Sequence, residues 1–384
     1  MKILFLTTIL LSQNRNGGEV GTQCFIDGLK HQGHQVTVVG YLRKGDYLEK
    51  KNQDIIIVSE RNTESRKAKI SSVYWLLLSL LKGMPYSATK YYSRLYISIV
   101  KKYLLTEEYE LIIIDHPQLG WLSHFLRQED KFIAISHNIE HEMYQEICSK
   151  ANNFISKFIY GREARLIKAE EDRLATIAKQ VWTVTENDAK YFTNIKGAAQ
   201  TIAFTQPPAS EKLLDKPLTK NFDIGLLASW SWRANLESLQ WFLGSVYPYL
   251  PTNLSIHIAG KGADWLTSNY PNIYYCGVVP DAQEFMAQAR VIAIPTLSGG
   301  GIQIKTLDAI ASGSSIVATP VALRGISDVP STVQVAEKPE EFANFLISAV
   351  SLPFTHKAFE QAKNWYHIRQ DKFIHDIASA INDL

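Results

Sequence analysis

Short apolar runs alternate with longer amphipathic stretches through the first half of the chain. The apolar runs predict strands at Lys2–Thr7, Gln35–Gly40, Ile55–Val58, Leu111–Asp115, Phe132–Ser136 and Val181–Val184. Helical periodicity covers intervening stretches such as Glu19–Gln32 and Gly161–Lys179. Strands that alternate with helices are typical of a parallel sheet covered on both faces.

The pattern breaks between residues 205 and 222 and then resumes. The run from Gln206 to Ser210 contains two prolines and is typical of a linker. The second series predicts strands at Phe222–Leu227, Asn253–Ala259, Ile273–Cys276, Val291–Ile294, Ser315–Ala318 and Val333–Val335. Its helices are Leu236–Leu243, Ala282–Gln288, Lys305–Ser312 and Pro339–Ser351, and a last helix covers Phe359–Leu384. We therefore expect an α/β protein with two doubly wound, Rossmann-like domains at residues 1–204 and 205–365.

Composition fits this picture and excludes some classes. A chain of 384 residues suits about two domains, and a net charge of +2 gives no general reason to bind nucleic acid. The three cysteines are far apart and lack metal-ligand spacing, which favours a reducing compartment. The chain opens on a predicted strand and not on a secretory signal, and its longest apolar run, Val73–Leu81, is far short of the roughly 20 residues that span a bilayer. We expect a cytoplasmic protein.

The strongest chemical signal follows the strand Val291–Ile294. Three glycines, Gly299, Gly300 and Gly301, precede Ile302 and a predicted helix that carries Lys305 and Asp308. Glycines let backbone N–H groups approach a phosphate, and a helix N-terminus adds partial positive charge. The lysine can neutralise phosphate oxygens and the carboxylate can accept from ribose hydroxyls. A glycine-rich turn before a packing helix would have the same sequence.

Three further loops in the second half follow strands. Arg233 has a fork that suits diphosphate oxygens, although a solvated surface arginine would look the same. Gly260 and Lys261 belong to a Gly-Lys-Gly loop whose glycines permit close approach of a ligand. Val278 follows the next strand, where backbone groups can contact a nucleobase edge. Ligands of open α/β sheets bind beyond the carboxyl ends of strands.

In the first half, candidate residues also follow strands. Gly17 and Gly18 precede the first helix and form an anion or sugar contact in this interpretation. His116 and His137 end two apolar strands, where a histidine can hydrogen-bond a sugar hydroxyl or relay a proton. Asn138 and Glu140 follow His137, and Glu140 can instead orient the next helix.

One segment of the first half is strongly basic. Residues 61–105 hold nine basic side chains against the single acid Glu64: Arg61, Arg66, Lys67, Lys69, Lys82, Lys90, Arg94, Lys101 and Lys102. Leucines and aromatic residues lie between them. Such a segment can rest on an anionic membrane surface, or it can be a helical insertion with a solvated basic face.

The order of these motifs resembles the family 4 glycosyltransferases of the GT-B fold. The matching motifs are Gly17-Gly18, Ser136-His137-Asn138, Gly260-Lys261-Gly262, Gly277 through Asp281, and Gly299 through Gly313 with Ser315 through Thr319 after it. The resemblance implies an acceptor-binding first domain, a second domain that binds the nucleotide sugar, and a last helix (366–384) that crosses back to the first. It also implies two domains facing each other across a cleft.

The chain departs from that family at two places. The family pair of glutamates falls at Gly300 and Asp308, so the carboxylate that would contact the donor sugar is missing and the ribose carboxylate is shorter. Ser229 falls at the position of the family arginine and Arg233 near that of its lysine. In this interpretation Lys305 takes over neutralisation of the diphosphate.

The resemblance implies a retaining transferase that moves a hexose from a GDP- or UDP-sugar to a lipid-linked, polysaccharide or other glycan acceptor. His137, His116 and Lys305 are the expected catalytic residues, and neither a metal nor a cofactor is expected. Peripheral contact with the inner face of an anionic membrane is expected through residues 61–105. The alternatives are a non-catalytic GT-B protein that binds a nucleotide sugar or supports a partner transferase, and other GT-B chemistry such as an epimerase or a phosphorylase.

Overall fold

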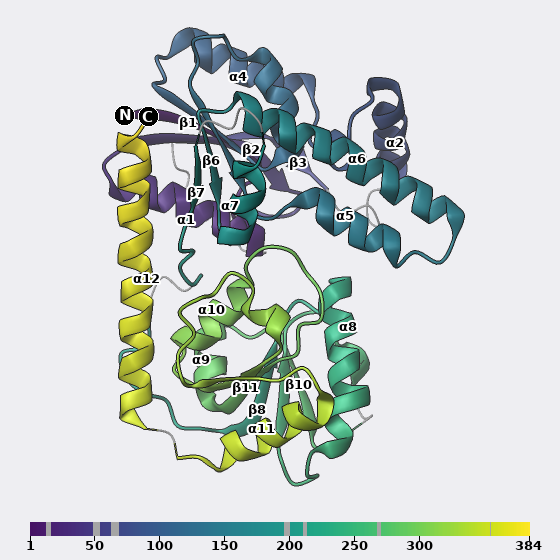
Figure 1. Ribbon diagram of the computed structural model, residues 1–384, viewed down its shortest axis with the longest axis vertical. Helices are drawn as coiled ribbons and strands as arrows, with labels where there is room; N and C mark the ends of the chain where they lie inside the picture. Colours follow the sequence, from purple (N-terminus) through teal and green to yellow (C-terminus); the bar gives the residue numbers. More distant parts are fainter. Residues whose placement is uncertain are drawn as a thin grey trace. The chain divides into compact units, whose positions relative to one another are not determined.

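The computed structural model describes residues 1–12, 17–48, 54–62, 69–195, 200–209, 213–266, 270–353 and 355–384. The chain forms two compact units (Figure 1). Unit 1 comprises Met1–Thr205 and Lys372–Leu384, and unit 2 comprises Gln206–Asp371. Within the described ranges, no helix is both long enough and apolar enough to cross a membrane.

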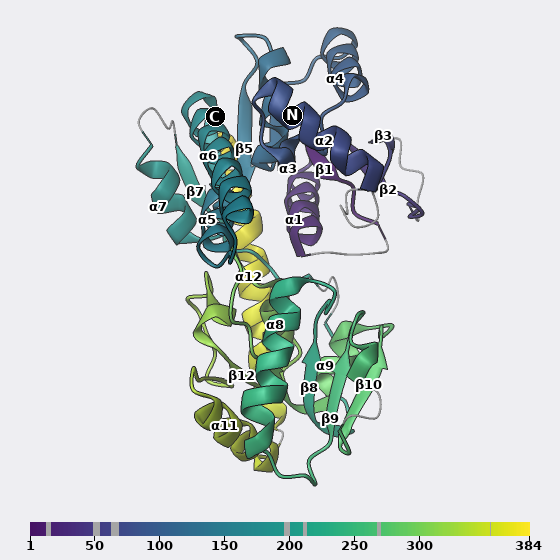
Figure 2. The same ribbon diagram turned by 90° about the vertical axis from the view of Figure 1, so that its right-hand side faces the viewer.

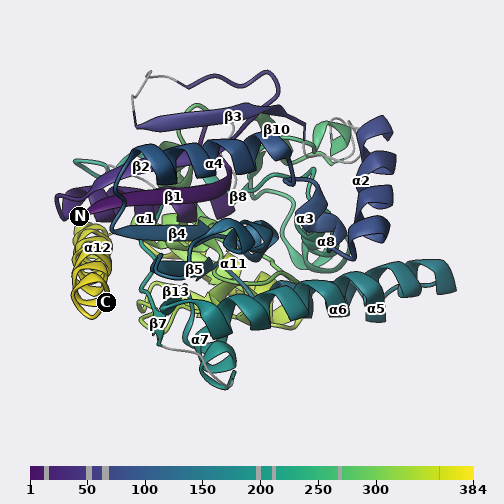
Figure 3. The same ribbon diagram turned by 90° about the horizontal axis from the view of Figure 1, so that it is seen from above.

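Unit 1 contains a parallel sheet of seven strands in the order β3-β2-β1-β4-β5-β6-β7, and Figure 3 shows β3, β2, β1, β4 and β5 side by side. The strands are β1 (Lys2–Ile9), β2 (Gln35–Arg43), β3 (Ile55–Arg61), β4 (Leu111–Asp115), β5 (Phe132–Ser136), β6 (Gln180–Thr183) and β7 (Thr201–Ala203). Strand order reverses between β1 and β4, so the chain leaves these two strands in opposite directions across the sheet. In open α/β sheets this reversal is where ligands bind.

The helices of unit 1 begin with α1, which follows β1 directly. They are α1 (Gly17–His31), α2 (Lys69–Lys82), α3 (Tyr86–Thr89), α4 (Arg94–Thr106), the 3-10 helix η1 (Pro117–Phe125), α5 (Glu140–Ser149), α6 (Phe154–Ile177) and α7 (Glu186–Thr193). Side chains of Ser93, Asn153 and Thr185 accept from backbone N–H groups and fix the starts of α4, α6 and α7.

Unit 2 contains a parallel sheet of six strands in the order β10-β9-β8-β11-β12-β13. The strands are β8 (Phe222–Leu227), β9 (Ile256–Ala259), β10 (Ile273–Gly277), β11 (Ala289–Ile294), β12 (Ser315–Ala318) and β13 (Val333–Val335). The helices are α8 (Arg233–Trp241) with the π turn η2 (Phe242–Val246), α9 (Ala282–Gln288), α10 (Ile304–Ala311) and α11 (Pro339–Ser351), and short 3-10 turns lie at Tyr247–Tyr249, Asp264–Leu266 and Pro320–Leu323. Here strand order reverses between β8 and β11.

Alternation along β11 shows how unit 2 is covered on both faces. Val291 and Ala293 join the core cluster under α8 and α11, whereas Ile292 and Ile294 join the cluster under α9 and α10. Figure 2 shows α8 and α9 flanking the strands. A strand buried on both faces is a near-continuous apolar run, which is why this strand is recognisable from the sequence.

The last helix, α12 (His356–Asn382), contributes residues to both units. Within unit 2, the buried Arg369 side chain donates to the backbone oxygen of Gln206 at 3.0 Å and pairs with Asp328. Within unit 1, Phe373 packs beside Phe25 of α1, with ring centroids 5.1 Å apart.

The expected α/β class with two doubly wound sheets is confirmed. Five predicted strands have the observed bounds, and the others differ at one or both ends. The prediction missed β7, a three-residue edge strand, and began α6 too late, at Gly161 in place of Phe154. Of the basic segment, Glu64, Arg66 and Lys67 lie outside the described residues.

The contact between α1 and α12 in unit 1 allows no side chain at Gly28. A Cβ there would lie 2.3 Å from Cδ1 of Ile377. We expect Gly28→Ala to lower the free energy of unfolding by about 1 kcal/mol, because overpacking outweighs the gain of alanine in a helix. Chemical denaturation measures this, and Ile377→Val should restore the loss by removing the opposing methyl group.

Gly161 of α6 is the matched control, since its Cβ would lie 3.6 Å from Cys148 Sγ, an ordinary contact. Gly161→Ala should stabilise the protein by roughly 0.5 kcal/mol. Equal effects of the two alanine substitutions would show that α12 does not pack on Gly28 as described.

Candidate active site

The loop after β11 places backbone amides ahead of α10. Gly299 and Gly301 have φ values of 141° and 60°, which side-chain-bearing residues rarely adopt. Arg324 Nη1 donates to Gly299 O at 2.9 Å and holds the loop from outside. Gly300 and Ile302 complete this loop, and α10 begins at Ile304. The loop and the helix N-terminus together form a surface of donors that favours an anion.

Lys305 lies in the first turn of α10, and an amide is its partner. Its Nζ donates to Asn235 Oδ1 at 2.9 Å, and Asn235 Nδ2 donates to Ser229 O at 3.0 Å. Burial lowers the pKa of Lys305 to about 8, and among the described residues no carboxylate pairs with it. Asn235, which the sequence did not single out, therefore links the lysine to the loop after β8. A half-buried cation without a counter-charge is costly and favours binding of an anion.

Two other predicted donor residues already have partners. The Arg233 side chain is 85% exposed and pairs with Glu237 at 2.7 Å across one helical turn. Asp308 is buried, and its Oδ1 accepts from the backbone N–H of Ala209 at 2.8 Å. The diphosphate role of Arg233 and the ribose role of Asp308 stay predictions. Of the two cations, Lys305 is less exposed than Arg233.

The Gly-Lys-Gly loop has a structural reason for its glycines, and the expected close approach of a ligand to this loop stays a prediction. A Cβ on Gly260 would lie 1.9 Å from Ala228 O, and one on Gly262 would lie 2.8 Å from Ser231 N. Lys261 O accepts from Trp230 N at 2.8 Å. The loop after β9 therefore packs on the loop after β8. Val278, after β10, is exposed.

In unit 1, the site is organised by Asp115, a residue that the sequence indicated only as the end of a strand. Its carboxylate is fully buried and receives Thr7 Oγ1 and Thr22 Oγ1 at 2.7 Å each on Oδ2. His137 Nε2 lies 2.8 Å from Oδ1. Burial alone would raise the pKa of Asp115, but the charges of His116 and His137 and these hydrogen bonds lower it to about 2. The carboxylate is therefore ionised at neutral pH.

His116 lies against this pair in an unusual backbone conformation. Its φ is 74°, and its ring centroid is 4.5 Å from that of His137. A Cβ on Gly18 would lie 3.9 Å from His116 Cε1, so the Gly17-Gly18 start of α1 adjoins the histidines. Burial lowers the pKa of His116 to about 4, which makes it neutral at pH 7.

Asp115, His116 and His137 also have the residue types and spacing of a metal site. One ligand atom from each lies within 4.8 Å of the others. The carboxylate oxygens already accept from two threonines and lie against His137, which accounts for the arrangement without an ion. The expectation of no metal stays a prediction.

Asn138 and Glu140 lead into α5. Ser136 Oγ donates to Asn138 O at 2.7 Å, and the buried Glu140 donates its backbone N–H to Glu171 Oε1 at 2.7 Å. Burial, and then the charge of Glu171, raise the pKa of Glu140 to about 7. Glu19 of α1 pairs with Arg43 at the end of β2, a contact that the sequence did not indicate.

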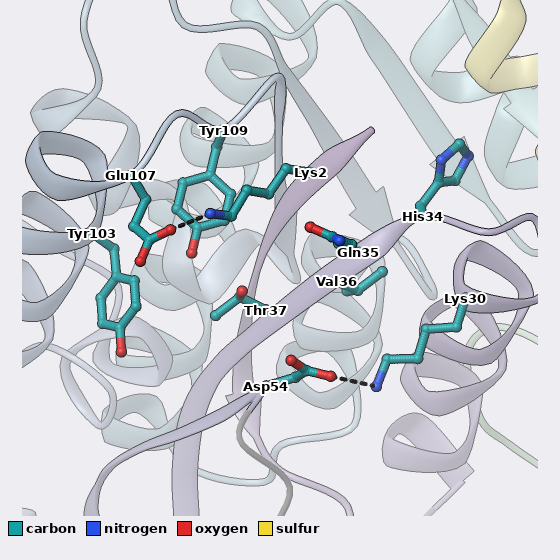
Figure 4. Close-up of a pocket in the computed structure, with 10 residues that line it drawn as sticks. All are labelled: Lys2, Lys30, His34, Gln35, Val36, Thr37, Asp54, Tyr103, Glu107 and Tyr109. Carbon is teal, nitrogen blue, oxygen red and sulfur yellow. Dashed lines mark hydrogen bonds and ion pairs between the residues drawn. The ribbon is translucent and has the colours of Figure 1, made fainter.

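A hollow of about 580 Å³ lies at the opposite edge of the unit 1 sheet (Figure 4). Its lining includes Lys2 and Gln35, the first residues of β1 and β2. Lys2 pairs there with Glu107, and Lys30 lies 4.0 Å from Asp54. Because the charges are paired and the strands begin here, we place the candidate site at the other edge.

The two sheets, each with a loop–helix site at its carboxyl edge, define a GT-B fold. Residues 221–351, most of unit 2, match the family model described as "Glycosyl transferases group 1". No curated protein matches the chain in sequence. The predicted GT-B fold and the resemblance to glycosyltransferases, enzymes of the transferase class, are confirmed, and the assignment to family 4 stays a prediction.

Solved structures with this fold match nearly the whole chain. WaaG, a glycosyltransferase involved in lipopolysaccharide biosynthesis, is 14% identical with a TM-score of 0.63, covering 98% of each chain. TarM is 11% identical with a TM-score of 0.62, again over 98% of each chain. Anabaena HepE in complex with UDP-glucose is 14% identical with a TM-score of 0.59 over 100% of each chain. At these identities the likeness shows the fold alone.

The uncompensated charge of Lys305 leads to a prediction about stability. The folded state has a pKa of about 8 here against 10.5 for the unfolded state, so the unfolded chain binds more protons between these values and stability rises with pH. Below pH 8 the charge costs stability. We expect Lys305→Met to stabilise unit 2 at pH 7 by on the order of 2 kcal/mol, as measured by thermal unfolding.

The stabilisation should shrink as pH rises from 8 toward 10.5. Lys261→Met, at an exposed lysine of the same unit, is the control and should change little. A less stable Lys305→Met protein at pH 7 would mean that the ammonium is compensated.

Proposed function

We propose that the protein is a retaining family 4 hexosyltransferase that uses a UDP- or GDP-sugar and a lipid-linked, polysaccharide or other glycan acceptor. The observation that carries the proposal is Lys305, a cation with an amide partner at the N-terminus of α10 beside a glycine loop. An ion pair with the diphosphate of a donor would offset the cost of burying this charge.

Transfer breaks the bond between the anomeric carbon and a phosphate oxygen, forms a bond from that carbon to an acceptor oxygen, and passes the proton of the acceptor hydroxyl to the leaving diphosphate. Negative charge grows on the leaving diphosphate. Lys305 and the backbone N–H groups around Gly299 and Gly301 would stabilise that charge, and they are in place before the reaction begins. We propose that these groups act without a metal or cofactor. Arg233 would assist from the rim after releasing Glu237.

UDP-sugars are the first donors to test, because the matched HepE structure contains UDP-glucose. WaaG acts in lipopolysaccharide biosynthesis, which supports a role in cell-envelope polysaccharide assembly for this chain. Asp308 would hold the ribose. This requires the carboxylate to accept from a ribose hydroxyl beside, or in place of, the backbone N–H of Ala209, which donates to Oδ1.

A thermal-shift panel tests the donor pocket. With EDTA present, UDP, GDP, ADP, TDP and their sugars are added singly, and we expect one nucleotide to raise the unfolding temperature by mass action. Lys305→Met should abolish the shift and lower kcat/KM about 100-fold, since it removes a charge that acts in the transition state. Arg233→Met is the matched control and should retain most of the shift.

The pH dependence of nucleotide binding distinguishes the role of Lys305 from that of Arg233. Affinity of the nucleotide should fall above about pH 8, where Lys305 loses its proton in the free enzyme. Near-normal turnover of Lys305→Met would refute its assigned role. A shift without turnover for any donor and acceptor pair would favour the non-catalytic alternative.

A membrane contact is also part of the proposal, and exposed apolar side chains support it. On α2 they are Val73, Tyr74, Leu77, Leu80 and Leu81, and on the first turns of α6 they are Phe154, Ile155 and Phe158. The two helices are joined by Arg162, which donates to Ser79 Oγ at 2.8 Å, and α6 passes close to α2 in Figure 3. We call these residues the α2–α6 surface.

The charge around the α2–α6 surface suits an anionic bilayer. Residues 69–106 and 150–162 contain lysines and arginines but no aspartate or glutamate. Apolar side chains among basic ones insert at the boundary of headgroups and acyl chains. We therefore extend the proposed contact from residues 61–105 to the start of α6 and place the enzyme at the inner face of a membrane, where a lipid-linked acceptor is presented.

Vesicle sedimentation tests this contact. The protein should sediment with vesicles containing anionic lipid at low salt and dissociate as salt rises. Leu77→Glu and Phe158→Glu should each weaken binding at least tenfold, because a carboxylate replaces an inserting side chain. Leu352→Glu, at a 60% exposed leucine of unit 2, is the control. Equal binding of all three variants would exclude the α2–α6 surface.

A further inference from the structure

The contact between Asp115 and His137 determines which ring nitrogen of the histidine can accept a hydrogen bond. An ionised carboxylate accepts and cannot donate. His137 Nε2, 2.8 Å from Asp115 Oδ1, must therefore carry the hydrogen. In the neutral ring the lone pair then lies on Nδ1, for which the described residues offer no hydrogen-bond partner.

The carboxylate is itself held in a fixed orientation. Thr7 on β1 and Thr22 on α1 both donate to Oδ2, which leaves Oδ1 for His137. His116 does not compete for Oδ1, because its Nε2 is 3.6 Å from the other oxygen and its ring is constrained by the backbone φ of 74°. Side chains from β1, α1 and β4 thus converge to fix one imidazole.

We propose that Asp115 is a positioning residue that fixes His137 as the Nε2–H tautomer, so that Nδ1 accepts a hydrogen bond from a hydroxyl group of a bound sugar. This inference rests on the proposed function for its ligand. A phosphate is disfavoured at this point, because an ionised carboxylate lies behind the ring and Nδ1 of the Nε2–H tautomer has no hydrogen to donate. The ligand chemistry of the unit 1 site is therefore that of a hydroxyl donor and not of an anion.

The first test needs no substrate. In protein labelled with nitrogen-15 at histidine, long-range proton–nitrogen spectra distinguish the two tautomers of His137, assigned with a His137→Gln variant. We expect Nε2–H in the wild type. In Asp115→Asn, the threonines still donate to the amide oxygen, and the amide NH₂ donates to Nε2, so the tautomer should switch to Nδ1–H. Nδ1–H in the wild type would overturn the proposal by itself, whether or not any variant folds.

The second test is kinetic and uses donors or acceptors that each lack one hydroxyl. One such compound should react about tenfold more slowly than its parent with the wild type, as expected for loss of one hydrogen bond. Asp115→Asn should slow the parent by at least this factor and be insensitive to the same deletion. Thr22→Val, which keeps the carboxylate, should retain both the tautomer and the sensitivity.

The outcomes separate this inference from the proposed function. If the tautomer is as expected but no sugar nucleotide reacts, the proposed function is wrong. The role of Asp115 in fixing the tautomer then stands, but the proposal that His137 binds a sugar hydroxyl is overturned. If the enzyme turns over and Asp115→Asn keeps its sensitivity to every hydroxyl deletion, the positioning role is overturned. If equimolar Zn²⁺ shifts the signals of both His116 and His137, the cluster is a metal site and the proposal is wrong.

Discussion

The reversal of strand order beside the first strand of each sheet is the constraint on which both candidate sites depend. At β1 and β4, and again at β8 and β11, the chain departs to opposite sides of the sheet, so that the loops after these strands separate. The residues that follow these strands are brought together at the carboxyl edge of each sheet. Thr7 and Asp115 come from the first reversal, and Asn235 and Lys305 from the second.

The two sites differ in charge, and the difference follows from how each charge is compensated. Asp115 accepts from two threonine hydroxyls and from His137, so its burial is compensated within unit 1. Lys305 has an amide partner and a pKa lowered by burial. The chemistry of unit 1 suits neutral hydroxyl groups, and that of unit 2 suits an anion. A nucleotide-diphosphate sugar and a glycan acceptor contain both kinds of group.

The sequence predicted the fold better than the site because strands and glycine loops are local signals. Apolar runs predicted both ends of β4, β5 and β8 correctly. Strand β7 has only three residues, and Ile202 is its one large apolar side chain. Asp115 was passed over, because its partners Thr7 and Thr22 are distant in sequence and only the fold joins them. Asn235 and Arg324 were missed for the same reason. The glycines of the Gly-Lys-Gly loop also have a packing reason that the sequence did not indicate, because they allow contact with the loop after β8.

Stability and function oppose each other at Lys305 and agree at Asp115. A half-buried lysine without a counter-charge destabilises the fold, so folding gives no reason for this residue in the first turn of α10. Asp115 is satisfied in the free protein and needs no ligand to complete it. The unit 1 site is therefore organised before binding, whereas the unit 2 site becomes electrostatically complete only with an anion. The absence of a carboxylate at Gly300 fits this difference between the two sites. An acid in that loop would compete with a bound anion for the positive charge of Lys305.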